Sequence, residues 1–183
     1  MQIGPVGIHD VSKKKEIWND FAKLYSGNLK VIKTKSKEFE RLQLTFEFQG
    51  ASIVFIETDT KPLRVEIELP NSKCDSKFLL SESDFMDKAL SFFSSKKVTT
   101  NSDELNRNYL LKSKNEEFVK SLFNDKKIQT IILQEKIMMI SGILRQTTFY
   151  IEMAVNRDIN NFDKLNNIGL LTKMIIEKTY ANK

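Results

Sequence analysis

The chain has 183 residues, of which 40% are hydrophobic and 13 are phenylalanine, and its formal net charge is +5. Its single Cys excludes an intramolecular disulfide and a Cys-based zinc site, and one His and six Gly leave little material for His-based catalysis or Gly-rich phosphate loops. No run of about 18 apolar residues occurs, so the sequence predicts no membrane span in this chain; no cofactor is expected either.

The basic residues are mostly lysine and are scattered among acidic residues. Only five are Arg, the residue whose planar guanidinium binds phosphates and base edges bidentately; they are Arg41, Arg64, Arg107, Arg145 and Arg157. The charge pattern therefore indicates a solvated surface and disfavours a nucleic-acid partner.

The first third of the chain predicts one helix followed by a meander of strands. Residues 1–11 are expected to form a flexible N-terminus. A helix is predicted over 12–26, because Ile17, Phe21 and Leu24 share one helical face and Gly27 allows the helix to stop. Strict alternation or short apolar runs predict strands over 29–33, 42–48, 52–56 and 63–69.

The middle of the chain changes to helical spacing. Ser81 to Asp84 form a capping-box-like start, followed by Phe85, Ala89, Phe92 and Phe93 on one predicted helical face. Residues 97–100 are interpreted as a short strand or a loop. Two further helices are predicted, one from Ser102 that carries Leu105, Tyr109 and Leu110, and one from Asn115 that carries Phe118, Val119, Leu122 and Phe123.

The last third predicts strands over 128–133, 137–144 and 147–155, the first two joined by a turn at 134–136, and then a long helix from Asn160 and Asn161. The two halves, 12–95 and 96–183, thus have the same order of elements, which favours a duplicated helix–sheet–helix unit. No Gly/Ser/Pro-rich linker divides them. We therefore predict a single α+β domain over 12–183, with antiparallel strand meanders packed against helices.

The element order resembles a class of bacterial domains without assigned function. The resemblance rests on the apolar spacing of the Trp18–Ala22–Leu24 opening, the Asp84-Phe85 helix start and the Phe162–Ile176 end, and it covers most of the chain. Several such domains follow membrane-spanning helices or end longer chains. The resemblance implies no activity, and the expected location is the cytoplasm or the soluble part of a larger membrane-associated protein.

Two sequence pairs carry reactive side chains. His9 lies beside Asp10, an arrangement that can orient a base, but no nucleophile is spaced to use it. Cys74 follows Lys73, which can lower a thiol pKa, but the His that would activate the thiol is remote in sequence. Both are interpreted as residues without a catalytic role.

Several carboxylates are predicted to share a sheet face. Glu66 and Glu68 alternate on one strand, and Glu47 lies on another; paired carboxylates can hydrolyse glycosides or bind metals. The same pattern is typical of any half-solvated strand, so a surface role is favoured. Glu152, Asp158 and Asp163 are interpreted in the same way, and 158–163 lacks the central Gly and terminal Glu of a calcium loop.

The phenylalanines fall mostly at the periods of buried faces and are interpreted as core: Phe46, Phe48, Phe55, Phe85, Phe92, Phe93, Phe118, Phe123, Phe149 and Phe162. Tyr150, near Arg145 and Arg157, gives only slight support for base stacking. The favoured function is a non-catalytic binding or interaction domain, with protein as the expected partner. The alternatives are a carrier of a small apolar ligand in a Phe-lined pocket and a carboxylate-based hydrolase. No catalytic, cofactor-binding or metal-ligating residue is predicted, and the oligomeric state stays open.

Overall fold

The computed structural model describes residues 11–33, 40–58, 61–70, 77–83, 96–155 and 161–181. The helices are α1 (Val11–Leu24), α3 (Asp103–Asn108), α4 (Glu116–Phe123), α5 (Lys126–Glu135) and α6 (Phe162–Ala181). The strands are β1 (Asn28–Lys33), β2 (Glu40–Phe48), β3 (Ala51–Thr58), β4 (Arg64–Pro70), β5 (Phe78–Glu82), β6 (Lys96–Val98), β7 (Tyr109–Ser113), β8 (Ile137–Arg145) and β9 (Thr148–Val155).

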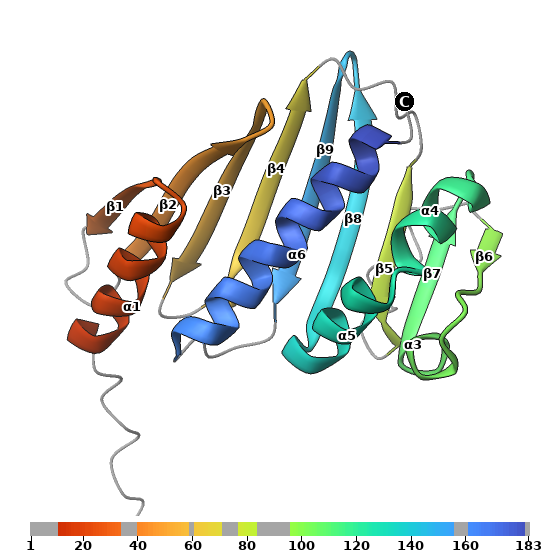
Figure 1. The fold of residues 1–183 in the computed structure, drawn as a ribbon, viewed down its shortest axis with the longest axis horizontal. Helices are drawn as coiled ribbons and strands as arrows, with labels where there is room; N and C mark the ends of the chain where they lie inside the picture. Colours follow the sequence, from red (N-terminus) through yellow and green to blue (C-terminus); the bar gives the residue numbers. More distant parts are fainter. Residues whose placement is uncertain are drawn as a thin grey trace, which may run out of the picture.

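All nine strands belong to one antiparallel sheet with the order β1-β2-β3-β4-β9-β8-β5-β7-β6 (Figure 1). The predicted α+β class, with antiparallel strands packed against helices, is confirmed. The strands of the two sequence halves form one continuous sheet, because β5 lies between β8 and β7. Whether the halves are a duplicated unit stays a prediction.

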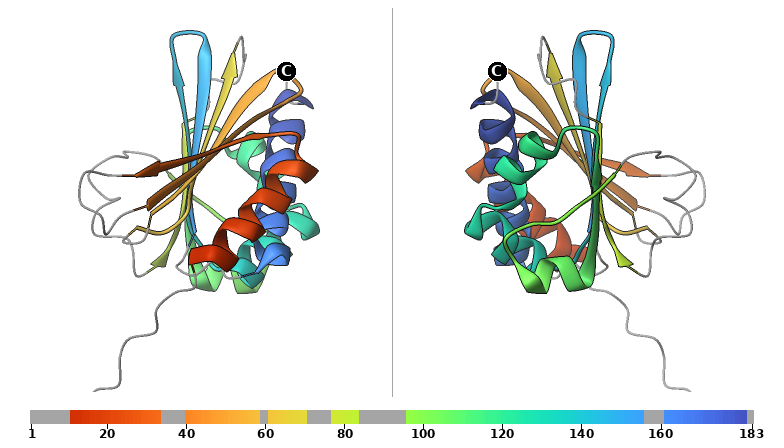
Figure 2. Two further views of the ribbon diagram at one scale, coloured as in Figure 1. Left: turned by 90° about the vertical axis from the view of Figure 1, so that its left-hand side faces the viewer. Right: turned by 90° about the vertical axis from the view of Figure 1, so that its right-hand side faces the viewer.

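The helices lie on one side of this sheet. Edge-on views place α1, α4, α5 and α6 against the same face (Figure 2). One core cluster fills the layer between, from Trp18 and Phe21 on α1, through alternate residues of the strands, to Ile175 and Ile176 on α6. None of the helices in the described ranges is both long enough and apolar enough to cross a bilayer.

A buried polar contact fixes α1 to the sheet. Glu57 on β3 is only 5% exposed and faces α1. Its carboxylate accepts a hydrogen bond from Nε1 of Trp18 at 3.2 Å and lies 2.8 Å from Nζ of Lys14. Because side chains alternate along a strand, Ile56 and Thr58 then point to the opposite face, away from the helices.

The predicted strand over 128–133 is wrong, because this segment belongs to α5. The side chain of Asp125 caps the helix by accepting hydrogen bonds from the backbone of Lys127 and Ile128. Ile128 and Ile132 are both fully buried, at a spacing of four residues. Lys136, in the predicted turn, has left-handed backbone angles and ends the helix. A short isoleucine-rich run does not distinguish strand from helix by itself.

The predicted helix start at 81–84 is also wrong where the structure describes it. Ser81 and Glu82 end strand β5, which pairs with β7 on one side and β8 on the other. The rest of that prediction, with Asp84, Phe85, Ala89, Phe92 and Phe93, lies outside the described residues. Of the flexible terminus expected over 1–11, residues 1–10 also lie outside them, and Val11 begins α1.

Two shorter segments complete the comparison. The helix predicted from Ser102 ends at Asn108, and Tyr109 and Leu110 begin β7 instead. This correction has a local cause: the segment alternates between buried and half-buried residues, the period of a strand. Of the two interpretations of 97–100, the strand is confirmed in part by β6, which covers Lys96–Val98.

Candidate functional site

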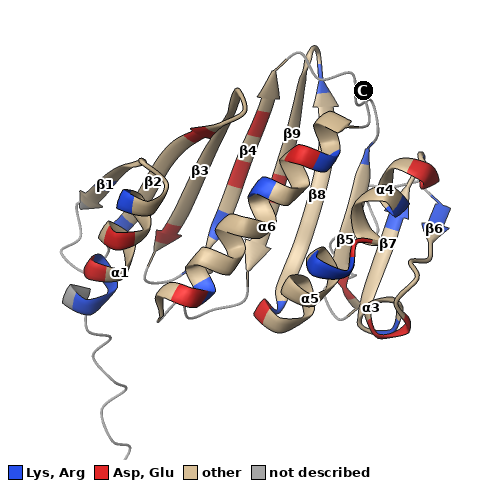
Figure 3. Ribbon diagram, in the orientation of Figure 1, with Lys and Arg blue, Asp and Glu red and all other residues tan. Residues whose placement is uncertain are grey.

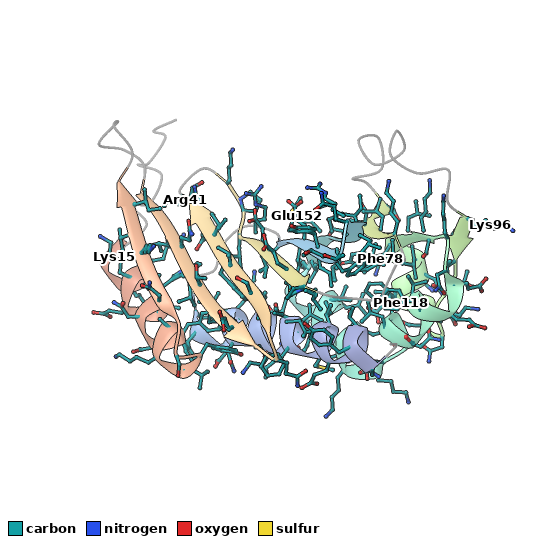
Figure 4. The ribbon with its side chains drawn as sticks, turned by 90° about the horizontal axis from the view of Figure 1, so that it is seen from above. Lys15, Arg41, Phe78, Lys96, Phe118 and Glu152 are labelled. Carbon is teal, nitrogen blue, oxygen red and sulfur yellow. The ribbon has the colours of Figure 1, made fainter. Side chains whose placement is uncertain are left out.

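The face of the sheet opposite the helices is the surface where the polar strand residues gather. Along β4 and β9, the buried residues face the helices and the alternate ones are half-buried or exposed. Figure 4 shows Arg41 and Glu152 on the side away from α6, and Phe78 and Phe118 on the helix side. At the β5 end this face is closed, since Leu79 and Ser81 are buried there.

The predicted carboxylates do share this face. Glu66 on β4 lies directly opposite Glu152 on β9, and Glu47 and Glu68 flank Ser52 in a neighbouring cross-strand row. Figure 3 shows acidic residues along β4. The pairing of β4 with β9 joins distant parts of the sequence, so sequence reasoning placed Glu66 on a face but did not place Glu152 opposite it.

An arginine occupies the space between the facing carboxylates. Nη2 of Arg64 lies 2.7 Å from Oε1 of Glu66, and Nη1 lies 3.8 Å from Oε1 of Glu152. Like charges directly opposite across two strands destabilise a sheet, and Arg64 offsets that repulsion. Within the described ranges no group of three or more His, Cys, Asp or Glu is placed to hold a metal ion. The arrangement is an ion-pair network, and it does not leave two free acids facing a cleft.

A hollow of about 250 Å³ opens on the same face, where β2, β3 and β4 come together. Among the residues that the structure describes, eight line it, of which three are basic and none is acidic; they are Arg41, Ile56, Thr58, Lys61, Pro62, Leu63, Arg64 and Ala154. We call it the basic hollow. Sequence reasoning missed it, although Arg41 continues the polar positions 43, 45 and 47 of the strand that alternation had predicted.

One guanidinium in the basic hollow is not fully bonded. Within the described part of the chain, Nε of Arg41 is buried and has no hydrogen-bond partner in the protein. Buried polar groups in native proteins are bonded in the great majority of cases, and an exception calls for an explanation such as a bound water or ion. The hollow thus combines basic side chains, one of them not fully bonded, with the apolar lining residues Ile56, Pro62, Leu63 and Ala154.

Strand β1 is the edge strand at the end of the sheet nearest the basic hollow. In the described part of the chain it pairs with β2 alone. Val31 is 41% exposed and Ile32 is 39% exposed, so β1 presents an apolar side chain on each of its faces. Ile32 lies directly opposite Arg41, so the edge strand and the basic hollow adjoin.

The described phenylalanines pack against one another, as the core interpretation predicted. Phe46 and Phe55 lie 5.8 Å apart between ring centroids, and both contact Phe21. Phe78 contacts Phe118 at 5.9 Å and Phe149 at 6.3 Å. The fully buried Phe123 is the fourth ring of this group and lies 5.6 Å from Phe78. Phe48 and Phe162 are partly buried against the same core.

The remaining sequence candidates are placed as follows. Arg145 lies over the ring of Tyr150, with its Cζ 5.5 Å from the ring centroid, which occupies one face of that ring. Asp163 is exposed in the first turn of α6. The residues that fall outside the described ranges are His9, Asp10, Lys73, Cys74, Arg157 and Asp158.

Comparison with known proteins gives little to add to this geometry. No protein-family model matches the chain, and no curated protein matches it. Among solved structures, the chain is similar to the crystal structure of the mycobacterial trehalose monomycolate transport factor A, TtfA, with 8% sequence identity. The alignment covers 87% of this chain and 94% of that one, with a TM-score of 0.45. At these values the similarity supports no conclusion about function.

Proposed function

We propose that this chain is a non-catalytic binding domain for a protein partner, and that the partner adds an extended segment to the edge strand β1. The observation that carries the proposal is the difference between the two ends of the sheet. An edge strand presents unpaired backbone N–H and C=O groups, which an incoming strand can satisfy.

The two edges are protected to different degrees. β6 has only three residues, and its Lys96 and Lys97 are exposed, which are the usual means of blocking edge-to-edge pairing. β1 has six residues and presents Val31 toward one face and Ile32 toward the other, both partly exposed. An added strand can therefore bury apolar side chains on both faces of β1.

Charge indicates the kind of segment that fits. Lys30 is exposed on β1 directly before Val31 and Ile32, and the chain carries a net charge of +5. Cross-strand pairs of opposite charge stabilise a sheet. We therefore expect a partner segment that alternates apolar and acidic residues.

The test is a selection of peptides from a random display library, followed by affinity measurement on three proteins. Val31→Lys/Ile32→Lys removes the apolar edge, and Leu170→Lys is the matched control, because Leu170 is 44% exposed on α6. Selected peptides should bind the wild type and the control equally. They should lose about tenfold or more in affinity for the double variant, the equivalent of about 1.4 kcal/mol.

Amide hydrogen exchange locates the bound peptide. A peptide that pairs with β1 should slow the exchange of β1 amides and leave those of β6 unchanged. Peptides that bind the double variant as tightly as the wild type, or that protect another element, would contradict the proposal.

A further inference from the structure

We propose that the basic hollow is a binding site for a small organic anion, in which Arg41 and Lys61 hold a carboxylate or phosphate group and the apolar lining residues contact a short hydrocarbon body. This site is separate from the strand addition proposed for β1. It rests on different observations and has its own test.

The first observation is the difference between two arginines on the same face. Nη2 of Arg64 lies 2.7 Å from Glu66 and its Nη1 lies 3.8 Å from Glu152, so the positive charge of Arg64 is already compensated. Arg41, which lines the same hollow, has a buried Nε without a partner. An unbonded N–H of a charged group is costly to bury, so an oxyanion that accepts from it gains more than it would from a solvated arginine.

The second observation is the planar geometry of the Arg41 guanidinium. A guanidinium presents its donors in a plane and matches the two oxygens of a carboxylate or phosphate. A side-on contact, with one oxygen at Nε and the other at a terminal nitrogen, requires only that the Arg41 side chain turn toward the hollow. Lys61, which is exposed at the rim, adds a second positive charge.

The third observation is the apolar part of the lining. Ile56, Leu63 and Ala154 lie beside the three basic residues, with Pro62 at the loop. An inorganic ion gains no binding energy from such a surface, whereas an alkyl chain that contacts it removes apolar surface from water. The volume of about 250 Å³ corresponds to about eight water molecules at roughly 30 Å³ each, which is the size of a short organic acid.

A second hollow is the other candidate for a ligand site. It lies between α5 and α6 and is lined by Asp125 and Lys178 among others. These two residues pair at 3.0 Å, so their charges are already compensated, and the lining is of mixed sign. The basic hollow is the stronger candidate because one of its described basic residues, Arg41, has a buried Nε without a hydrogen-bond partner in the protein.

The experiment titrates the protein with hexanoate, hexyl phosphate, hexanol and inorganic phosphate, and follows the Nε–Hε signal of Arg41 by NMR. Arg41→Met removes the guanidinium. The control is Arg145→Met, the same change at an exposed arginine elsewhere on this sheet face. Thermal unfolding of all three proteins with and without hexanoate measures the linked stabilisation.

We expect the Arg41 signal to shift and saturate with hexanoate or hexyl phosphate, and whichever binds more tightly identifies the anionic group. Arg41→Met should weaken this binding about tenfold or more and abolish the stabilisation, while Arg145→Met keeps both. Several results would overturn the proposal: no saturating shift, equal binding of hexanol, binding unaffected by Arg41→Met, or an equal response to inorganic phosphate, which means an adventitious ion only.

Discussion

Gly142 makes the contact between β8 and the aromatic core directly testable. It lies opposite Phe78 in the pairing of β5 with β8, on the helix side of the sheet. A Cβ added there would collide with Cε1 of Phe78 and lie 2.7 Å from Cζ of Phe149. Both rings have no exposed surface and are held by Phe118. We therefore predict that Gly142→Ala destabilises the fold.

The magnitude follows from two opposing effects. Overpacking a well-filled core costs about 1–3 kcal/mol. Replacing Gly by Ala in a strand interior recovers roughly 0.5–1 kcal/mol of backbone entropy. The middle of these ranges leaves a net loss of about 1 kcal/mol, which lowers the melting temperature by roughly 2–4 °C for a domain of this size.

A double-mutant cycle with Phe78→Leu identifies the cause of that loss. The smaller side chain leaves room for the new Cβ of Gly142→Ala, so the two changes together should cost at least about 1 kcal/mol less than their sum. Gly50→Ala is the control, because Gly50 has a φ of +80° and nothing within 4 Å of the added atom. Its cost of about 1 kcal/mol is backbone strain and should add to that of Phe78→Leu.

Denaturant midpoints of the four proteins in the cycle give these free energies. A neutral Gly142→Ala variant would show that the rings do not approach β8 as closely as the structure places them. Additivity within about 0.5 kcal/mol in the cycle would show the same.

Three further predictions concern charged and polar side chains. Burial raises the pKa of Tyr25 to about 12, above its value near 10 in unfolded chains. The stability that Tyr25 contributes is therefore complete below pH 10 and is lost as pH rises toward 12. The free energy of unfolding, measured over this range, should depend less on pH in Tyr25→Phe than in the wild type. Asp125→Ala should cost about 1 kcal/mol by removing the cap of α5. Desolvation opposes ionisation of Asp125, but hydrogen bonds from Lys178 and the backbone lower the pKa of this carboxyl overall. The difference in unfolding free energy between Asp125→Ala and the wild type should therefore shrink as pH falls through that pKa. Arg64→Gln should destabilise the sheet by about 0.5–1 kcal/mol at neutral pH, because Glu66 then faces a like charge, and added salt should reduce this loss in urea titrations.

Strands with one buried face were predictable from the sequence. The predictions over 42–48, 63–69 and 147–155 differ by at most two residues at either end from β2, β4 and β9. Each of these strands alternates apolar and polar residues, and a shift of one residue would move every apolar side chain to the polar face. The same reasoning placed Glu66 on the correct face.

The segments that failed lacked this alternation. Ile131 and Leu133 broaden the apolar run of α5, so its period is ambiguous, and the deciding signal was the Asp125 cap together with a buried Gln129. The side chain of Gln129 donates to the backbone oxygen of Phe123 at 2.7 Å. β5 was missed because it is buried on both faces and ends at residues, Ser81 and Glu82, that also suit a helix start.

The candidate site depends on contacts that no local pattern encodes. Arg41 and Arg64 lie on strands that alternation predicted, yet the sequence does not tell which strand lies beside which. Two arginines with similar local sequence thus have different surroundings, because Arg64 meets Glu152 only through the pairing of β4 with β9.

The different surroundings of Arg64 and Arg41 distinguish an arginine that stabilises the fold from one that binds a ligand. A charged side chain kept for stability is expected to have partners, as Arg64 has, since an unbonded buried donor lowers stability. If Arg41 serves only the fold, then Arg41→Met should lower stability through lost packing. If Arg41 is kept for a ligand, Arg41→Met should make the free protein as stable as the wild type or more so and remove its response to hexanoate. Only the second outcome combines retained stability with lost binding, so measuring both on one variant decides which role the residue has.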